Sequence, residues 1–157
     1  MSTAGARAAS SICRQDGDYL KISAVWMDIE AIESWYRGKP DVVMQVKKSL
    51  NDNVTGQFYY SPDRSQHGKW VFTNDFLFNW YSSVEELVFV WVEEDDRGDP
   101  TTYKIEYDKF KIEVPINVHD IVMWNPPYNF NSCPDGPKGN QELSGGAIKW
   151  EITSYRF

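Results

Sequence analysis

The side chains most able to do chemistry in this sequence are carboxylates, which gather in two short stretches. Residues 93–96 (EEDD) follow directly on an apolar segment, and Asp99 lies three residues beyond them. Glu94 and Asp96 continue the alternation of Val90 and Val92, so an extended chain would point these carboxylates to one side. The other group follows the first alternating segment of the chain and runs up to the next one: Asp28, Glu30, Glu33 and Asp41.

Clustered carboxylates of this kind suit a hard cation. Calcium takes about six to eight oxygen ligands, mostly carboxylates and backbone carbonyls. Two loops that meet at one end of a β-sandwich can supply them, so the two stretches are candidates for a calcium site. The alternative is a solvated acidic surface that discourages pairing of strand edges.

The sequence favours a non-catalytic protein. It contains no G-x-S-x-G, P-loop or H-E-x-x-H motif, and its two histidines, His67 and His119, lie in segments without a nucleophile signature. Paired carboxylates could support glycoside hydrolysis on paper, as they could in any acidic chain. We therefore predict that the protein binds rather than catalyses.

Aromatic residues are unusually frequent, with seven Trp, nine Tyr and eight Phe. This composition fits a β core or an aromatic platform for a ligand. Trp124, Tyr128 and Phe130 surround a Pro/Asn-rich segment and are the best candidates for a carbohydrate platform in a loop. The same three residues could instead cap the end of the core.

The net charge of the chain and the lengths of its apolar segments exclude some classes of partner. The net charge of −7 and the isoelectric point near 4.8 argue against nucleic acid, whose binding needs clustered Lys and Arg. No apolar run approaches the roughly 20 residues that span a bilayer. Calcium dependence would favour an extracytoplasmic location. Cys13 and Cys133 form neither a zinc motif nor a disulfide framework, and their redox state stays open.

Alternation of apolar and polar residues predicts strands along most of the chain. Residues 86–92 (ELVFVWV) are apolar at both parities, which predicts a strand buried on both sides. In the first stretch, Leu20, Ile22, Ala24 and Trp26 share a parity and are predicted to share a face. The alternating stretches are residues 20–26, 42–46, 57–60, 70–81, 86–92, 103–107, 110–114, 119–124 and 147–154.

These stretches predict an all-β fold, an antiparallel two-sheet β-sandwich of about eight strands. Only residues 27–35 have a helical pattern, and residues 125–146 are predicted to form a long loop because they hold four Pro and four Gly. We expect a flexible N-terminal tail over residues 1–14 and a single domain over residues 15–157.

In this arrangement the sequence resembles the C2 domain family over roughly residues 18–115. Residues 20–46 resemble the first hairpin of the family, with residues 38–43 (GKPDVV) in place of G-x-S-D-P-Y-V. Residues 70–78 (WVFTNDFLF) resemble W-N-E-x-F-x-F, and residues 86–97 (ELVFVWVEEDDR) resemble L-x-V-x-V-x-D-x-D-R.

The resemblance implies a sandwich whose loops at one end bind Ca²⁺ and dock on phospholipid. Matching positions assign metal ligation to Asp41, Glu94 and Asp96, with Asp99 as the third acid of the later loop. Glu33 is the nearest counterpart of the first-loop Asp of the family. The chain departs from the pattern where Glu94 replaces Asp and where Asp99 follows Asp96 closely.

Together these observations predict a non-catalytic, C2-like binding or accessory module, with the acidic loops as its candidate Ca²⁺ site. A carbohydrate-binding module that uses loop aromatics and a metal-free protein-interaction domain are the alternatives. Protein, carbohydrate and lipid head group all remain open as partners.

Overall fold

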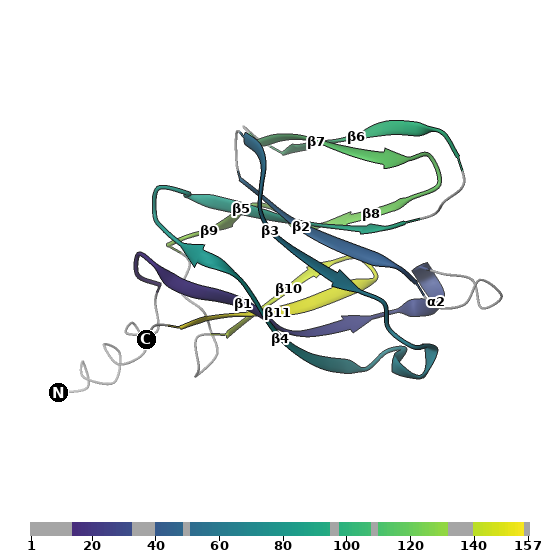
Figure 1. Cartoon of the computed structure of the whole chain (residues 1–157), viewed down its shortest axis with the longest axis horizontal. Helices are drawn as coiled ribbons and strands as arrows, with labels where there is room; N and C mark the ends of the chain where they lie inside the picture. Colours follow the sequence, from purple (N-terminus) through teal and green to yellow (C-terminus); the bar gives the residue numbers. More distant parts are fainter. Residues whose placement is uncertain are drawn as a thin grey trace.

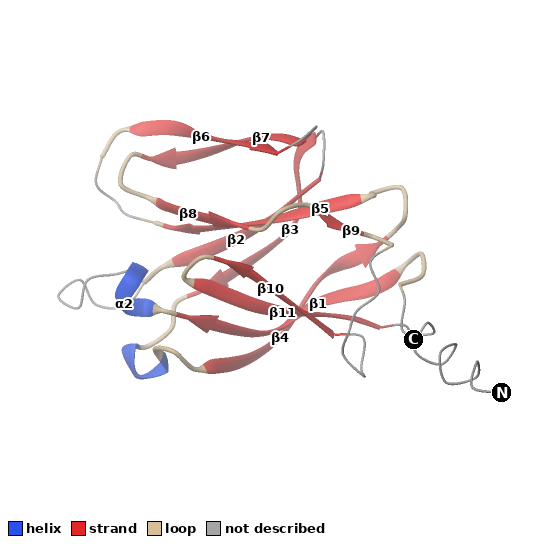
Figure 2. Cartoon of the chain, turned by 180° about the vertical axis from the view of Figure 1, so that it is seen from behind, coloured by secondary structure: helices blue, strands red, loops and turns tan. Residues whose placement is uncertain are grey.

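The computed structural model describes residues 14–32, 40–48, 51–94, 98–107, 110–131 and 140–155. The fold is all-β with antiparallel pairing throughout, as the sequence predicts. Strands account for almost all regular structure, and the two helical segments are short (Figure 2). The elements are β1 (Asp18–Met27), α2 (Ile29–Ile32), β2 (Val42–Lys48), β3 (Asn51–Tyr60), η2 (Arg64–Gln66), β4 (Trp70–Trp80), β5 (Glu86–Glu93), β6 (Pro100–Tyr107), β7 (Phe110–Asn117), β8 (Ile121–Trp124), β9 (Tyr128–Asn129), β10 (Asn140–Gly145) and β11 (Ile148–Tyr155).

Two sheets and a hairpin form three layers. The four-stranded sheet has the order β10-β11-β1-β4, and the five-stranded sheet has the order β3-β2-β5-β8 with the short β9 also paired to β5. The β6–β7 hairpin lies on the far side of the five-stranded sheet (Figure 1). Because β1 and β2 belong to different sheets, residues 20–46 form a crossover between sheets and not the hairpin that the sequence suggested.

The main core lies between the two sheets. Trp80, Trp91 and Trp150 are fully buried there, with Trp91 and Trp150 ring centroids 5.3 Å apart. Each buried aromatic side chain removes a large apolar area from water, which is the dominant favourable term in folding. Much of the aromatic content is therefore core, as one of the two interpretations of the composition expects.

A second apolar layer joins the five-stranded sheet to the hairpin. Val88 and Val90 on β5 pack against Ile105 on β6 and Ile112 on β7, and all four are at most 1% exposed. The other face of β5 sends Leu87, Phe89 and Trp91 into the main core, so β5 is buried on both sides. The prediction drawn from its two apolar parities is confirmed.

The prediction that Leu20, Ile22, Ala24 and Trp26 share a face is wrong. Leu20 and Ile22 enter the main core, but a register shift between Ile22 and Ala24 inserts a bulge, after which Val25 and Met27 point inward. A one-residue shift moves every later side chain to the opposite face of the sheet. Trp26 consequently lies on the outer face, half-buried.

Arg14 shows that the folded unit includes a residue assigned to the predicted tail. Its side chain is 7% exposed and donates hydrogen bonds to Ser154 Oγ, Phe130 O and Tyr128 Oη at 2.8–2.9 Å. The guanidinium also lies 4.5 Å from the centroid of Trp80. Charge-assisted hydrogen bonds satisfy this buried cation, so the domain extends to Arg14 at least. The rest of the predicted tail, with Cys13, lies outside the described residues, and so does Cys133.

The segment predicted as a long loop contains β9 and β10 within residues 125–146. β10 pairs with β11 as an outer strand of the four-stranded sheet. Of the predicted helix over residues 27–35, only the single turn α2 is helical: Met27 ends β1, and residues 33–35 lie outside the described part of the chain. In the part of the chain that the structure describes, no helix could cross a membrane.

Candidate functional site

The structure brings Asp41 and Glu94 together at one end of the five-stranded sheet. Asp41 precedes β2 and Glu94 follows β5, which are neighbouring antiparallel strands. The backbone N–H of Glu94 donates to the carbonyl of Asp41 at 2.9 Å, and Ser61 Oγ donates to Asp41 Oδ1 at 3.1 Å. Both carboxylates are exposed to solvent. Two of the five predicted metal ligands are therefore neighbours.

The other predicted ligands do not complete a described metal site. Asp99 is exposed at the base of the β6–β7 hairpin, where its carbonyl accepts a hydrogen bond from the Val118 N–H at 3.0 Å. Asp96 and Glu33 lie outside the described residues. Within the described ranges, no group of three or more His, Cys, Asp and Glu side chains is arranged to hold a metal ion.

The predicted loop platform is not assembled as one surface. Tyr128 is 9% exposed and Phe130 is 5% exposed, and both pack on Trp80 in the main core. Trp124 is half-buried on the other side of the five-stranded sheet, where its ring meets Tyr107 at 6.3 Å. Tyr128 and Phe130 thus cap the core, which was the alternative interpretation of these residues.

Aromatic residues that the sequence did not single out as a binding platform form a surface on the four-stranded sheet. We define the aromatic face as six side chains on the outer side of β1, β4 and β11. The exposed fraction is 81% for Phe72, 50% for Phe76, 42% for Trp70 and 39% for Tyr155, and Tyr19 and Trp26 are half-buried. The members of the aromatic face are Tyr19, Trp26, Trp70, Phe72, Phe76 and Tyr155.

The strand register divides the aromatic face into two groups of rings. Tyr19 stacks on Tyr155 at a centroid distance of 5.3 Å and meets Phe76 edge to face, also at 5.3 Å. Seven residues further along β1, Trp26 lies opposite Trp70. At about 3.3 Å per residue the two groups are roughly 20 Å apart along the strand.

Polar side chains fill the space between the two groups. Ser23 Oγ lies 3.0 Å from both Glu151 Oε1 and Thr153 Oγ1. Lys21 Nζ lies 5.3 Å from the Tyr155 ring centroid, and Lys149 Nζ lies 4.6 Å from that of Trp26. On β1, β10 and β11 these two lysines balance the two glutamates of the face, Glu142 and Glu151. The face is therefore close to neutral along these strands, in a chain whose net charge is −7.

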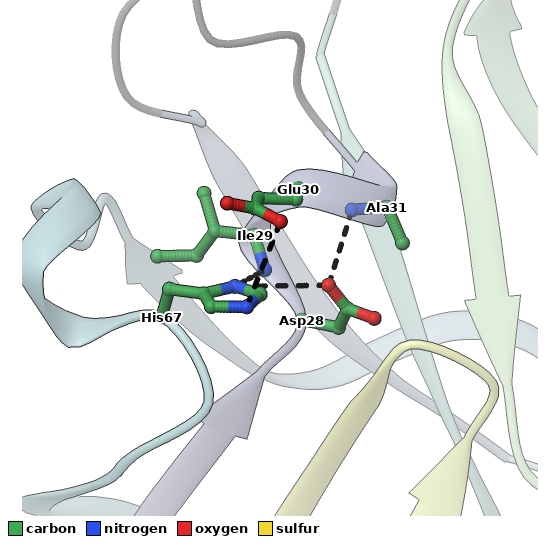
Figure 3. A network of polar contacts seen from close by, with 5 residues as sticks. All are labelled: Asp28, Ile29, Glu30, Ala31 and His67. Atoms are coloured by element: carbon green, nitrogen blue, oxygen red, sulfur yellow. Dashed lines mark hydrogen bonds and ion pairs between the residues drawn. The ribbon is translucent and has the colours of Figure 1, made fainter.

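A third feature is a polar network around His67, which joins the β3–β4 connection to the acidic segment after β1 (Figure 3). His67 Nδ1 accepts a hydrogen bond from the Ile29 N–H at 3.1 Å and lies 3.6 Å from Asp28 Oδ1. Glu30 Oε2 lies 4.0 Å from His67 Nε2. Asp28 Oδ1 also accepts a hydrogen bond from the Ala31 N–H, which begins the single turn of α2. The network ties two connections together, and both Asp28 and Glu30 take part in it.

Two adjoining grooves flank the Asp41–Glu94 pair. One has a volume of about 370 Å³ and lies between the outer face of the five-stranded sheet and the hairpin. The other, of about 220 Å³, lies between the beginning of β2 and the end of β3, and Tyr59 and Tyr60 line it. Burial raises the pKa of the Tyr60 hydroxyl above its ordinary value. The two grooves share Val43 and Glu94.

No family model, no curated protein sequence and no solved structure matches this chain. The argument for function therefore depends on the surfaces described above.

Proposed function

We propose that this protein is a non-catalytic binding module that takes a neutral carbohydrate chain on the aromatic face. The observation that carries the proposal is the uncovered row of aromatic side chains on the four-stranded sheet. Exposed apolar patches of this kind mark sites of interaction in soluble proteins. The apolar C–H faces of pyranose rings pack on aromatic rings, whereas sugar hydroxyls need polar partners nearby.

Two features of the face favour a sugar over other ligands. Its most exposed apolar residues, Trp70, Phe72 and Phe76, are all aromatic, whereas the exposed aliphatic residues Val118 and Ile121 lie elsewhere. Balanced charge on β1, β10 and β11 gives little attraction for an anionic bilayer or an anionic polymer. Ser23, Thr153 and Glu151 supply hydroxyl and carboxylate groups between the two groups of rings.

The test is co-sedimentation of the full chain with insoluble cellulose, chitin and xylan, followed by titration with soluble oligosaccharides of increasing length. We expect Phe72→Ala to weaken binding about tenfold, the equivalent of about 1.4 kcal/mol, and Trp70→Ala combined with Phe72→Ala to abolish it. Tyr103→Ala is the matched control, because Tyr103 is an exposed aromatic residue on the hairpin. Equal binding by the parent and the double variant would contradict the proposal.

Calcium binding at the end of the sandwich that carries Asp41 and Glu94 is the second candidate function. The hydrogen bond that holds these residues side by side favours it, together with the resemblance to the C2 family. Saturating Ca²⁺ at about 100 times its Kd would stabilise the folded state by about 2.7 kcal/mol. A thermal melt of metal-stripped protein tests this, with Mg²⁺ and Asp41→Asn as controls. An unchanged Tm would remove the candidate.

A further inference from the structure

The grooves beside Glu94 form a continuous path across one side of the molecule. The floor of the larger groove is the outer face of β2 and β5, where Val43, Gln45 and Val92 contribute side chains. Its roof is the beginning of β6 and the end of β7, including Thr101 and Ile116. Because Val43 and Glu94 also line the smaller groove, the path continues past them to Tyr59.

The path exists because the hairpin packs closely on the five-stranded sheet along most of its length but not at one end. Along most of its length Ile105 and Ile112 pack directly on the valines of β5. Near Pro100 and Asn117 close packing gives way to the groove, whose volume of about 370 Å³ far exceeds the space that a single ion fills. An elongated ligand suits this shape.

The negative charge of the residues that line the grooves favours a positively charged ligand. Asp41, Glu94 and Asp120 line the two grooves, and among the described lining residues none is Lys, Arg or His. Glu94 lies where the grooves meet, so it faces a ligand in either one. A net charge of −7 also favours the approach of a positively charged partner.

The remaining lining residues suit long basic side chains on an extended backbone. Pro115 and Ile116 on the roof offer apolar surface for the methylene stems of Lys and Arg, which bury their stems while the charged end stays near polar groups. Gln45 supplies an amide that can hydrogen-bond a peptide backbone. Tyr59, 70% exposed, offers a ring face to a cation at the far end of the path.

We infer that this acidic groove, defined by Asp41, Glu94, Asp120 and the β6–β7 hairpin above them, is a docking site for an extended basic segment of a partner protein. The inference is independent of the proposed carbohydrate function, because the groove and the aromatic face lie on opposite outer faces of the sandwich.

The test is fluorescence anisotropy of a labelled octapeptide in which Lys or Arg alternates with Leu, titrated with the full chain at physiological salt. Its controls are the same peptide with Glu in place of the basic residues and a peptide of alternating Ser and Leu. We expect binding of the basic peptide alone, with an affinity that falls at least tenfold in Glu94→Gln and further when Asp41→Asn is added.

Glu113→Gln is the matched protein control, since Glu113 is an exposed carboxylate on β7 that does not line either groove. It should leave the affinity within twofold, as should Phe72→Ala on the aromatic face. Circular dichroism confirms that each variant is folded.

The inference would be overturned by no binding of the basic peptide, by equal binding of the Glu peptide, or by equal affinity in the parent and Glu94→Gln. Binding of CaCl₂ that depends on Glu94, without binding of the peptide, would assign this end to a metal and overturn it as well.

Discussion

The two outer faces of the sandwich carry different kinds of apolar side chain, and only one of the two faces is covered. The face of the five-stranded sheet is aliphatic, and the β6–β7 hairpin covers it, so that Val43, Val88, Val90 and Val92 are at most 6% exposed. The face of the four-stranded sheet is aromatic and uncovered, with Phe72 81% exposed. An aliphatic residue gains only from burial, whereas an aromatic ring can also bind a ligand through its face. The aliphatic face is therefore suited to burial, and the uncovered aromatic face to the carbohydrate site proposed above.

The largest expected change in the free energy of unfolding comes from truncating one side chain on each face and comparing the two losses. Ile112→Ala removes a fully buried side chain between the hairpin and the sheet and should cost about 2–5 kcal/mol. Phe72→Ala removes an exposed ring and should change the free energy of unfolding by no more than about 0.5 kcal/mol. Urea denaturation measures both. Similar losses in the two variants would mean that the aromatic face is packed surface and would break the comparison.

The next effect concerns the backbone at the base of the hairpin. Gly98 has φ +97°, and a Cβ there would lie 2.9 Å from His119 Cδ2. We expect Gly98→Ala to destabilise the fold by about 1–3 kcal/mol and to weaken peptide binding in the groove. The control is Gly68→Ala, because Gly68 has φ +65° but no atom within 4 Å of the added Cβ. If both substitutions lower the free energy of unfolding equally, backbone strain alone explains the loss, and the base of the hairpin is not closely packed.

The smallest expected change in stability comes from a substitution on β4, the strand that carries the most exposed rings of the aromatic face. Asn74 on β4 has φ 52°, and its side-chain carbonyl accepts a hydrogen bond from Lys21 Nζ at 3.2 Å. Asn74→Gly and Asn74→Ala both lose this bond, so their difference reports the backbone conformation alone. Thermal unfolding should show Asn74→Ala less stable than Asn74→Gly by about 1 kcal/mol. Equal stability would mean that β4 adopts an ordinary extended conformation here.

The sequence predicted only part of the candidate site. The sequence placed Asp41 and Glu94 next to strands, and the pairing of β2 with β5 made them neighbours. The hairpin that roofs the groove was predicted as two alternating stretches, but alternation does not specify which surface a hairpin covers. The sequence around His67 carries no nucleophile signature, and the contact of His67 with Asp28 depends on two connections meeting in space.

The sequence by itself determined most of the strands, though not β9 or β10, together with their antiparallel character and the doubly buried β5, because alternation and apolar runs are local properties of the chain. It could not determine which aromatic residues are core. On β4, Phe76 lies opposite Lys21 and Phe78 lies opposite Leu20, so one extra residue, Leu77, places two aromatics of equal parity on opposite faces. The pleat has a period of two residues, and a single bulge therefore inverts every assignment beyond it. Only the tertiary pairing of β1 with β4 decided that Phe72 and Phe76 face solvent while Phe78 and Trp80 pack inside.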